Sequence, residues 1–221
     1  IVKYANHLGI HTSLLTFLQF MFGFLFLLAF NLFSKRSAKE HNVIKFSSKI
    51  KLMVWGISLG LTTTLYYLSI QYIRVSVGII LLMQSIWISL VAEAVLLKKL
   101  PSKGKLAGGI IVLLGTTLAT NLFQNNNALD YRGIILGFGA GISYALAIYA
   151  SSTVEKELPS SVRSQFLVLG GLLLIVAFWN MDIIRYIQPN ALPWGLLIAI
   201  FGTILPPLLF TKGILKTGIA M

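Results

Sequence analysis

The chain has 221 residues, of which 57% are apolar and only 11% are charged, with a mean hydropathy of +0.85 and a net charge of +12. No soluble domain of this length needs so many apolar side chains, so the composition predicts a membrane protein. In a soluble protein the excess of Lys and Arg would suggest a nucleic-acid partner. Here it indicates loop charges that orient a membrane protein, and we expect no nucleic acid. The sequence contains no cysteine, which excludes disulfides and thiolate metal sites.

Apolar runs long enough to cross a bilayer recur along the whole chain. A hydrocarbon core of about 30 Å requires roughly 20 apolar residues in a helix. By this measure we expect seven spans, at residues 13–33, 50–72, 75–97, 104–123, 133–153, 164–181 and 192–211. An eighth begins near Gly213, and residues 1–4 are interpreted as the end of a further helix. Because the chain begins with Ile rather than Met and stops inside an apolar run, we expect it to be a fragment of a longer bilayer protein.

The basic residues are divided unequally between the two faces that these spans define. Of the 18 Lys and Arg residues, 14 fall on one face and 4 on the other. The positive-inside rule places the face with 14 in the cytoplasm. We therefore expect loops 34–49, 98–103 and 155–163 to be cytoplasmic, in a plasma membrane that would be the inner membrane of a bacterium.

Two stretches of the chain, 60–79 and 202–221, share a pattern of residues. Laid over each other without gaps, they pair Arg74 with Lys216. Because Arg74 lies on the outer face and Lys216 on the inner face, the two copies would run in opposite directions, as inverted repeats of transporters do. A second pairing lays span 13–33 on span 164–181 and places Gly23, Ala29 and Phe30 opposite Gly171, Ala177 and Phe178. Chance similarity between Leu- and Gly-rich helices is the alternative.

Three segments carry a familiar order of residues. Residues 67–120 contain YLSIQYIRVSVGII and KKLPSKGKLAGGII, residues 132–149 read RGIILGFGAGISYALAIY, and residues 202–217 read GTILPPLLFTKGILKT. They resemble the block from the third to the fifth helix, the start of the second repeat, and the eighth helix of the EamA family of the drug/metabolite transporter superfamily.

The resemblance implies an all-α fold, a polytopic membrane helix bundle built from two inverted five-helix repeats. Residues 1–123 would form the first repeat, with its first helix mostly missing, and residues 133–221 the second, cut in its ninth helix. The implied function is secondary transport of a small metabolite, amino acid or drug-like solute by alternating access between the repeats. The chain departs from the family where Gln84 or Ser85 replaces a usual proline, and where Lys98 or Lys99 replaces a usual acid.

Polar groups and helix breaks at membrane depth are the candidate substrate-cavity residues. The candidates are Tyr66, Tyr67, Gln84, Ser85, Ser89, Tyr144, Pro206 and Pro207. A buried tyrosine hydroxyl needs a partner, and an interrupted helix frees carbonyls that can face a substrate. The expected cavity is walled by spans 50–72, 75–97, 133–153 and 192–211. For the serines and prolines the alternatives are helix packing and a tolerated bend, and threonines 62–64 can bond their own helix.

Glu93 is the one acid inside an expected span, which makes it a candidate for proton coupling. The alternative is that it lies one turn from the cytoplasmic end and pairs with Lys98 or Lys99. No catalytic or metal-ligand pattern points to an enzyme or a cofactor. The match of residues 56–60 to G-x-S-x-G lies in an apolar helix rather than in a strand–turn–helix. A scaffold or partner subunit that does not transport is the other class left open, and a homodimer is one assembly compatible with such a bundle.

Overall fold

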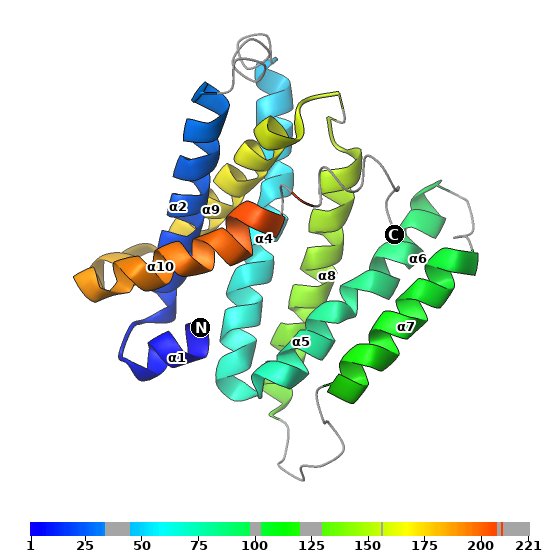
Figure 1. Ribbon diagram of the computed structural model, residues 1–221, viewed down its shortest axis with the longest axis horizontal. Helices are drawn as coiled ribbons and strands as arrows, with labels where there is room; N and C mark the ends of the chain where they lie inside the picture. Colours follow the sequence, from blue (N-terminus) through cyan, green and yellow to red (C-terminus); the bar gives the residue numbers. More distant parts are fainter. Residues whose placement is uncertain (34–44, 98–102, 120–129, 156, 207–208, 210–221) are drawn as a thin grey trace.

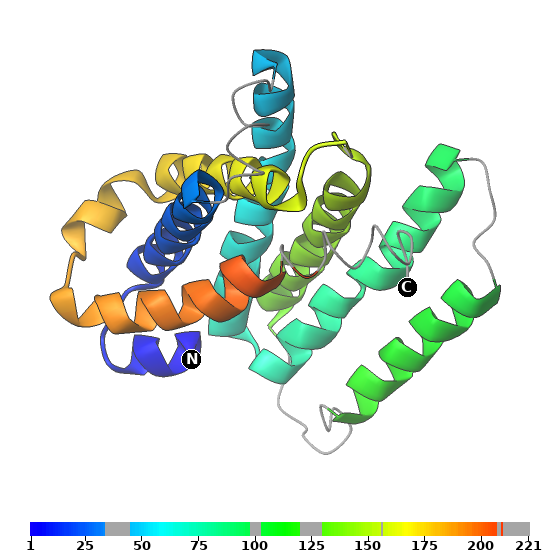
Figure 2. The same ribbon diagram turned by 45° about the horizontal axis from the view of Figure 1, so that its top comes forward.

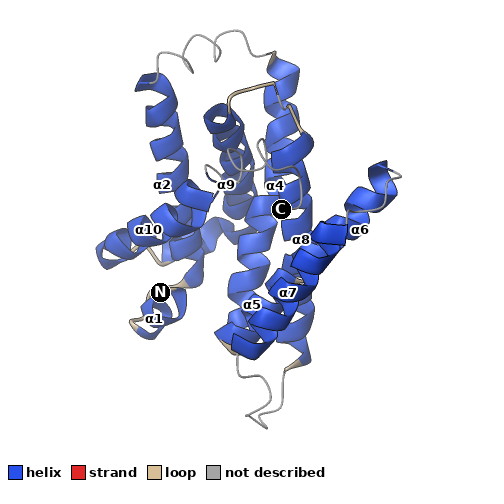
Figure 3. Ribbon diagram, turned by 45° about the vertical axis from the view of Figure 1, so that its right-hand side comes forward, coloured by secondary structure: helices blue, strands red, loops and turns tan. Residues whose placement is uncertain are grey.

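The computed structural model describes residues 1–33, 45–97, 103–119, 130–155, 157–206 and 209. Within these residues every regular element is a helix (Figure 3), which confirms the all-α prediction. The helices are α1 (Val2–His7), α2 (Thr12–Phe33), α4 (Phe46–Tyr72), α5 (Val75–Met83), α6 (Ser85–Leu97), α7 (Lys103–Ala119), α8 (Tyr131–Thr153), α9 (Ser160–Arg185), η2 (Pro189–Ala191), α10 (Leu192–Ala199) and η3 (Ile200–Ile204).

Five of the helices in the described part of the chain are long and apolar enough to cross a membrane. They are Thr12–Phe33, Phe46–Tyr72, Val75–Ala92, Tyr131–Ser151 and Ser160–Arg185. The expected spans at 104–123 and 192–211 correspond to shorter apolar helices, Leu106–Gly115 and Pro189–Ile204. Their ends, and the expected eighth span, lie outside the described residues. Several membrane-length helices in one chain establish a polytopic helical bundle.

Helix α4 lies at the centre of the bundle, with α9 packed on one side and α8 on the other. Helix α2 lies against α9, and α10 crosses α2 (Figure 1). Helices α5 and α6 pack on α8, and α7 lies outermost beside them, as the turned view makes clear (Figure 2). The outward surfaces are rich in large apolar side chains, as expected where lipid replaces water.

Small residues allow α4 and α9 to approach until their backbones touch. A Cβ atom on Gly56 would collide with the carbonyl group of Leu167, and one on Gly60 with the backbone of Gly171. From the other side, a Cβ on Gly170 would collide with the carbonyl of Met53. Such small-residue contacts are how helices gain close packing in lipid, where the hydrophobic effect does not drive association.

Helix α8 packs through a second small-residue face. Gly133, Gly137 and Gly141 recur every four residues, and each meets side-chain or backbone atoms of α4 or α5. Two hydroxyls reinforce the contact between α8 and α4. Ser143 Oγ donates to the carbonyl of Ser58 at 2.8 Å, and Ser69 Oγ donates to that of Gly133 at 2.7 Å. The packing face expected from the four-residue spacing is confirmed.

The predicted continuous span 75–97 is interrupted at Gln84, where α5 ends and α6 begins one residue later. The side chain of Gln84 donates to the carbonyl of Ile80 at 3.1 Å and accepts from Trp87 Nε1 at 2.6 Å. The second irregularity is η3, a wide π-helical turn that ends two residues before Pro206. Proline has no N–H to continue a regular ladder, and π-turns often accompany functional sites.

The glycine contact between α4 and α9 predicts a strong effect of adding one methyl group. We expect Gly170→Ala to lower the free energy of unfolding by about 1–3 kcal/mol, because the new Cβ would overlap the Met53 carbonyl. Gly139→Ala in α8 is the matched control, since its Cβ would meet only Leu65 Cδ1 at 3.4 Å, an ordinary contact. Denaturant unfolding of both variants in detergent micelles measures the difference. Equal stability of the two variants would contradict the close approach.

Candidate functional site

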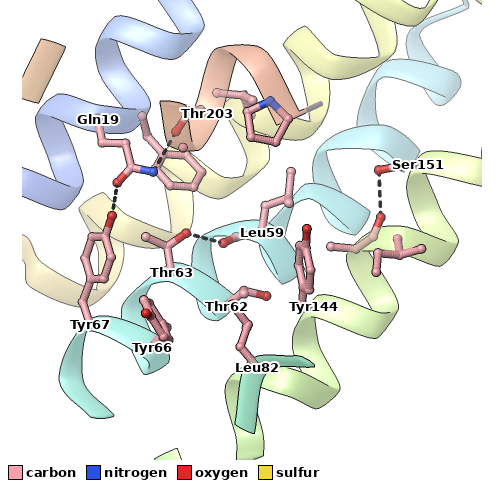
Figure 4. Close-up of a pocket in the computed structure, with 16 residues that line it drawn as sticks. Gln19, Leu59, Thr62, Thr63, Tyr66, Tyr67, Leu82, Tyr144, Ser151 and Thr203 are labelled. Atoms are coloured by element: carbon pink, nitrogen blue, oxygen red, sulfur yellow. Dashed lines mark hydrogen bonds between the residues drawn. The ribbon is translucent and has the colours of Figure 1, made fainter. Parts of the chain in front are cut away.

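A cavity of ≈ 240 Å³ opens where α2, α4, α5, α8, α9 and the η3 turn converge (Figure 4). Eight polar side chains line it: Gln19, Thr62, Thr63, Tyr66, Tyr67, Tyr144, Ser151 and Thr203. The remaining walls are mostly apolar and include Phe20, Leu59, Leu82 and Val168. No charged side chain among the described residues lines the cavity. An apolar pocket with a few placed polar groups is the usual form of a small-molecule site.

One hydrogen-bonded chain joins three helices on the cavity wall. Tyr67 Oη donates to Gln19 Oε1 at 2.7 Å, and Gln19 Nε2 donates to Thr203 Oγ1 at 2.8 Å (Figure 4). All three side chains are buried. The amide of Gln19 on α2 therefore bridges α4 and the π-helical turn, and each of its partners would be left unsatisfied in an apolar setting without it.

Other hydroxyls on the wall bond to their own helices. Thr62 Oγ1 donates to the Ser58 carbonyl at 2.7 Å, and Ser151 Oγ to the Ala147 carbonyl at 2.8 Å. These hydroxyls keep only acceptor capacity for a solute. The tyrosine hydroxyls of Tyr66 and Tyr144 form no hydrogen bond to any described residue, and both project toward the cavity (Figure 4). They are available both to donate to a solute and to accept from it.

The structure brings together Tyr66, Tyr67, Tyr144 and Pro206, four of the residues singled out from sequence, on the wall of this cavity. The tyrosines come from α4 and α8, and Pro206 lies two residues after the end of η3. Pro207 lies outside the described residues. Glu93 has its backbone in α6, but its side chain is also outside the described part, so its coupling role stays a prediction.

Three other candidates do not line the cavity. Gln84 makes the local bonds at the break between α5 and α6, and its neighbour Trp87 is 40% exposed on the outside of the bundle. Ser89 Oγ donates to the carbonyl of Ile86 at 2.7 Å. Ser85 is fully buried, and its hydroxyl has no partner among the described residues. These placements match the packing alternative for the two serines.

Sequence reasoning missed the contributions of α2 and α9 to the site. Gln19 is an uncharged polar residue in the middle of an apolar run, and an amide at that depth is the signal that would have found it. Thr203 lies three residues before Pro206, and Ser151 lies near the end of its span. Phe20 and Val168 carry no such signal, because apolar residues are common throughout these helices.

The Tyr67–Gln19 hydrogen bond is expected to couple α4 and α2 energetically. In a double-mutant cycle of Tyr67→Phe with Gln19→Leu, we expect an interaction energy of about 0.5–2 kcal/mol in unfolding free energy, as for buried bonds in membrane proteins. The control cycle pairs Tyr67→Phe with Thr153→Val, whose hydroxyl bonds its own helix at the end of α8. Additive effects in the first cycle would argue that the bond contributes nothing.

Comparison with known proteins places the chain in a family. The sequence profile of the EamA-like transporter family matches residues 1–121, more than half of the chain. The uncharacterized transporter YwfM of Bacillus subtilis (strain 168) is 25% identical over 159 residues, which cover 70% of this chain and 52% of YwfM. The threonine/homoserine exporter RhtA of Escherichia coli (strain K12) is 28% identical over 200 residues, covering 86% of this chain and 61% of RhtA.

The chain thus spans between half and two thirds of the length of these curated relatives. No solved structure matches it significantly. The match of the family profile, the transporters among its relatives and the five membrane-length helices agree with each other. This multi-pass membrane protein belongs to the EamA-like transporter family.

Proposed function

We propose that the protein is a secondary transporter that moves a small amino-acid-like solute through the cavity between α2, α4, α8, α9 and η3. The observation that carries the proposal is the lining itself, with seven hydroxyls and one amide set in apolar walls and no charged side chain among the described lining residues. Such a lining suits a solute that is uncharged or zwitterionic and has its own hydrogen-bonding groups.

The size of the cavity and the relatives favour the same class. Its volume of ≈ 240 Å³ is slightly below the range of about 300–1,000 Å³ that is usual for drug-sized ligands. RhtA is named as an exporter of threonine and homoserine, two small hydroxylated amino acids. The free hydroxyls of Tyr66 and Tyr144 are suited to bind a hydroxyl or carboxylate of such a solute.

Alternating access between two inverted repeats, residues 1–123 and 133–221, is the mechanism we propose. In support, α4 of the first half packs on α9 of the second, while α10 of the second packs on α2 of the first. The glycine contacts show the same symmetry. Gly60 contacts Gly171, and in the alignment of the repeats these two residues correspond to Gly202 and Gly23. Gly23 in turn contacts Thr203, the neighbour of Gly202. The Gln19–Thr203 bond crosses between the halves, so rocking of one half against the other would break and remake it.

The charge distribution supports a cytoplasmic position for loops 34–49, 98–103 and 155–163, in the plasma membrane of a bacterium. Both relatives are bacterial proteins. A homodimer stays a prediction.

Proteoliposomes that contain the full-length protein test transport directly. We expect flux of labelled threonine or homoserine above that of protein-free liposomes. Tyr66→Phe and Tyr144→Phe should each lower kcat/KM roughly 3- to 10-fold, the effect of one lost hydrogen bond. Tyr131→Phe, which removes the hydroxyl of a tyrosine that is 66% exposed, is the control and should leave flux unchanged. Retained binding of a partner protein without flux of any amino acid would favour a scaffold instead.

Thiol labelling tests the position of the cavity, because none of the 221 residues is a cysteine that would react. Cysteines at Tyr144 and Ser151 should react with small polar thiol reagents, and solute should protect them. A cysteine at Ile135, on the lipid-facing surface of α8, should stay unreactive. For orientation, Glu157→Cys should react from the cytoplasmic side and Ile187→Cys from the opposite side. Reactivity of Ile135→Cys but not Tyr144→Cys would place the aqueous path elsewhere.

A further inference from the structure

The most unusual side chain in the described part of the bundle is Arg163, in the first turn of α9. Only 1% of its surface is exposed. One guanidinium nitrogen, Nη2, donates to the carbonyl of Ser151 in the last turn of α8, and Nε is buried without a hydrogen-bond partner. A guanidinium has five N–H donors in a fixed fork, and the described residues use only part of this capacity.

The positive charge of Arg163 is poorly compensated within the described residues. Glu155 is near enough to act on it favourably, but no described carboxylate lies within ion-pair distance. The carboxylate of Glu155 instead lies 3.4 Å from Lys51 Nζ. The Ser151 carbonyl contributes only the partial negative charge of a helix C-terminus. A buried charge with so little compensation is destabilising, which makes Arg163 a candidate for a functional role.

A second unpartnered group belongs to the residue that follows Arg163 in the sequence. Ser164 is fully buried, and its Oγ has no hydrogen-bond partner among the described residues. Ser164 lies four residues before Val168, which lines the cavity, so both project from the same face of α9. Ser151, the partner of Arg163, also lines the cavity. Neither Arg163 nor Ser164 lines the cavity itself, but Arg163 donates to the Ser151 carbonyl beside it and Ser164 lies about one helical turn from Val168.

We infer that the end of the cavity beside Ser151 is an anion subsite, in which Arg163 and Ser164 receive the carboxylate of the transported solute. This inference rests on the proposed transport of an amino-acid-like molecule and adds the group that recognises its acid end. The fork of Arg163 keeps one donor on the Ser151 carbonyl and offers the others to the carboxylate oxygens, a geometry that guanidinium groups favour. The nearly complete burial of both residues favours a solute over a lipid headgroup, which would reach the site from the bundle surface.

The competing structural role for Arg163 is to cap the C-terminus of α8 through the Ser151 carbonyl. The two roles differ in what happens when the charge is removed. A capping arginine stabilises the fold, so its loss should lower the unfolding temperature. A subsite arginine is poorly compensated in the empty protein, so Arg163→Gln should leave the unfolding temperature unchanged or raise it.

The decisive experiment compares an acid with its neutral amide in proteoliposomes of the full-length protein. L-threonine and L-threoninamide compete for counterflow of labelled threonine, and the ratio of their inhibition constants is measured. In the wild type we expect threonine to be preferred about tenfold or more, as for a charge-assisted hydrogen bond. Arg163→Gln should reduce the preference to less than about threefold, Ser164→Ala should reduce it severalfold, and Arg163→Lys should retain part of it.

Lys51→Gln is the matched control, since it removes a neighbouring cation whose side chain is 57% exposed and should leave the ratio unchanged. An unchanged ratio in Arg163→Gln and Ser164→Ala, with or without a lowered unfolding temperature of Arg163→Gln, overturns the subsite while the transport proposal stands. Absence of wild-type flux overturns both proposals. A preference that appears only in pure phosphatidylcholine and is lost when anionic lipid is present would assign the site to a headgroup and also overturn the inference.

Discussion

The backbone contact between α4 and α9 is the constraint on which the rest of the bundle depends. Gly56 and Gly60 on one helix, and Gly170 and Gly171 on the other, remove the Cβ atoms that would hold the two axes apart. In lipid, such contacts replace the hydrophobic effect as a source of helix association. With α4 against α9, the other side of α4 packs on α8 through the Ser58 and Ser69 hydrogen bonds, and α2 packs against α9.

The cavity is a consequence of this arrangement. The helices meet closely through small residues, and they leave space where Leu59, Val168 and Tyr144 stand between them. Three of the seven hydroxyls on the wall, those of Thr62, Thr63 and Ser151, bond within their own helices. The amide of Gln19 is different, because it bonds both to Tyr67 and to Thr203, on two other helices. A side chain that joins three helices across the wall is well placed to hold one arrangement of the bundle and to release it.

The charges near the cavity are also unevenly distributed. The described lining of the cavity is neutral, whereas Arg163 lies just beyond it, buried and with little opposing charge. For the proposed zwitterionic solute, a neutral passage would keep the barrier low along most of its path. In the same proposal, a single cation at one end would orient the solute without a deep electrostatic trap in the middle, where release would be slow.

The sequence by itself determined where the apolar spans lie, although two of the seven expected spans correspond to shorter helices in the described part of the chain. It also determined the packing face of Gly133, Gly137 and Gly141. These features depend on apolar length and on a four-residue period, which are local properties of the chain. Tyr66, Tyr67, Tyr144 and Pro206 were found because a polar group or a proline at membrane depth is conspicuous in an apolar run.

Only the tertiary structure decided which of these residues share a cavity. Gln19 and Thr203 are 184 residues apart, so their bond cannot be read from periodicity. Gln84 and Ser89 were conspicuous for the same reason as the tyrosines, yet their hydrogen bonds are local and they lie away from the cavity. The burial of Arg163 was equally out of reach, since a basic residue beside a loop predicts a solvated charge. The direction in which a side chain points, and its burial, depend on which helices pack together. Small-residue contacts between distant parts of the chain set that packing.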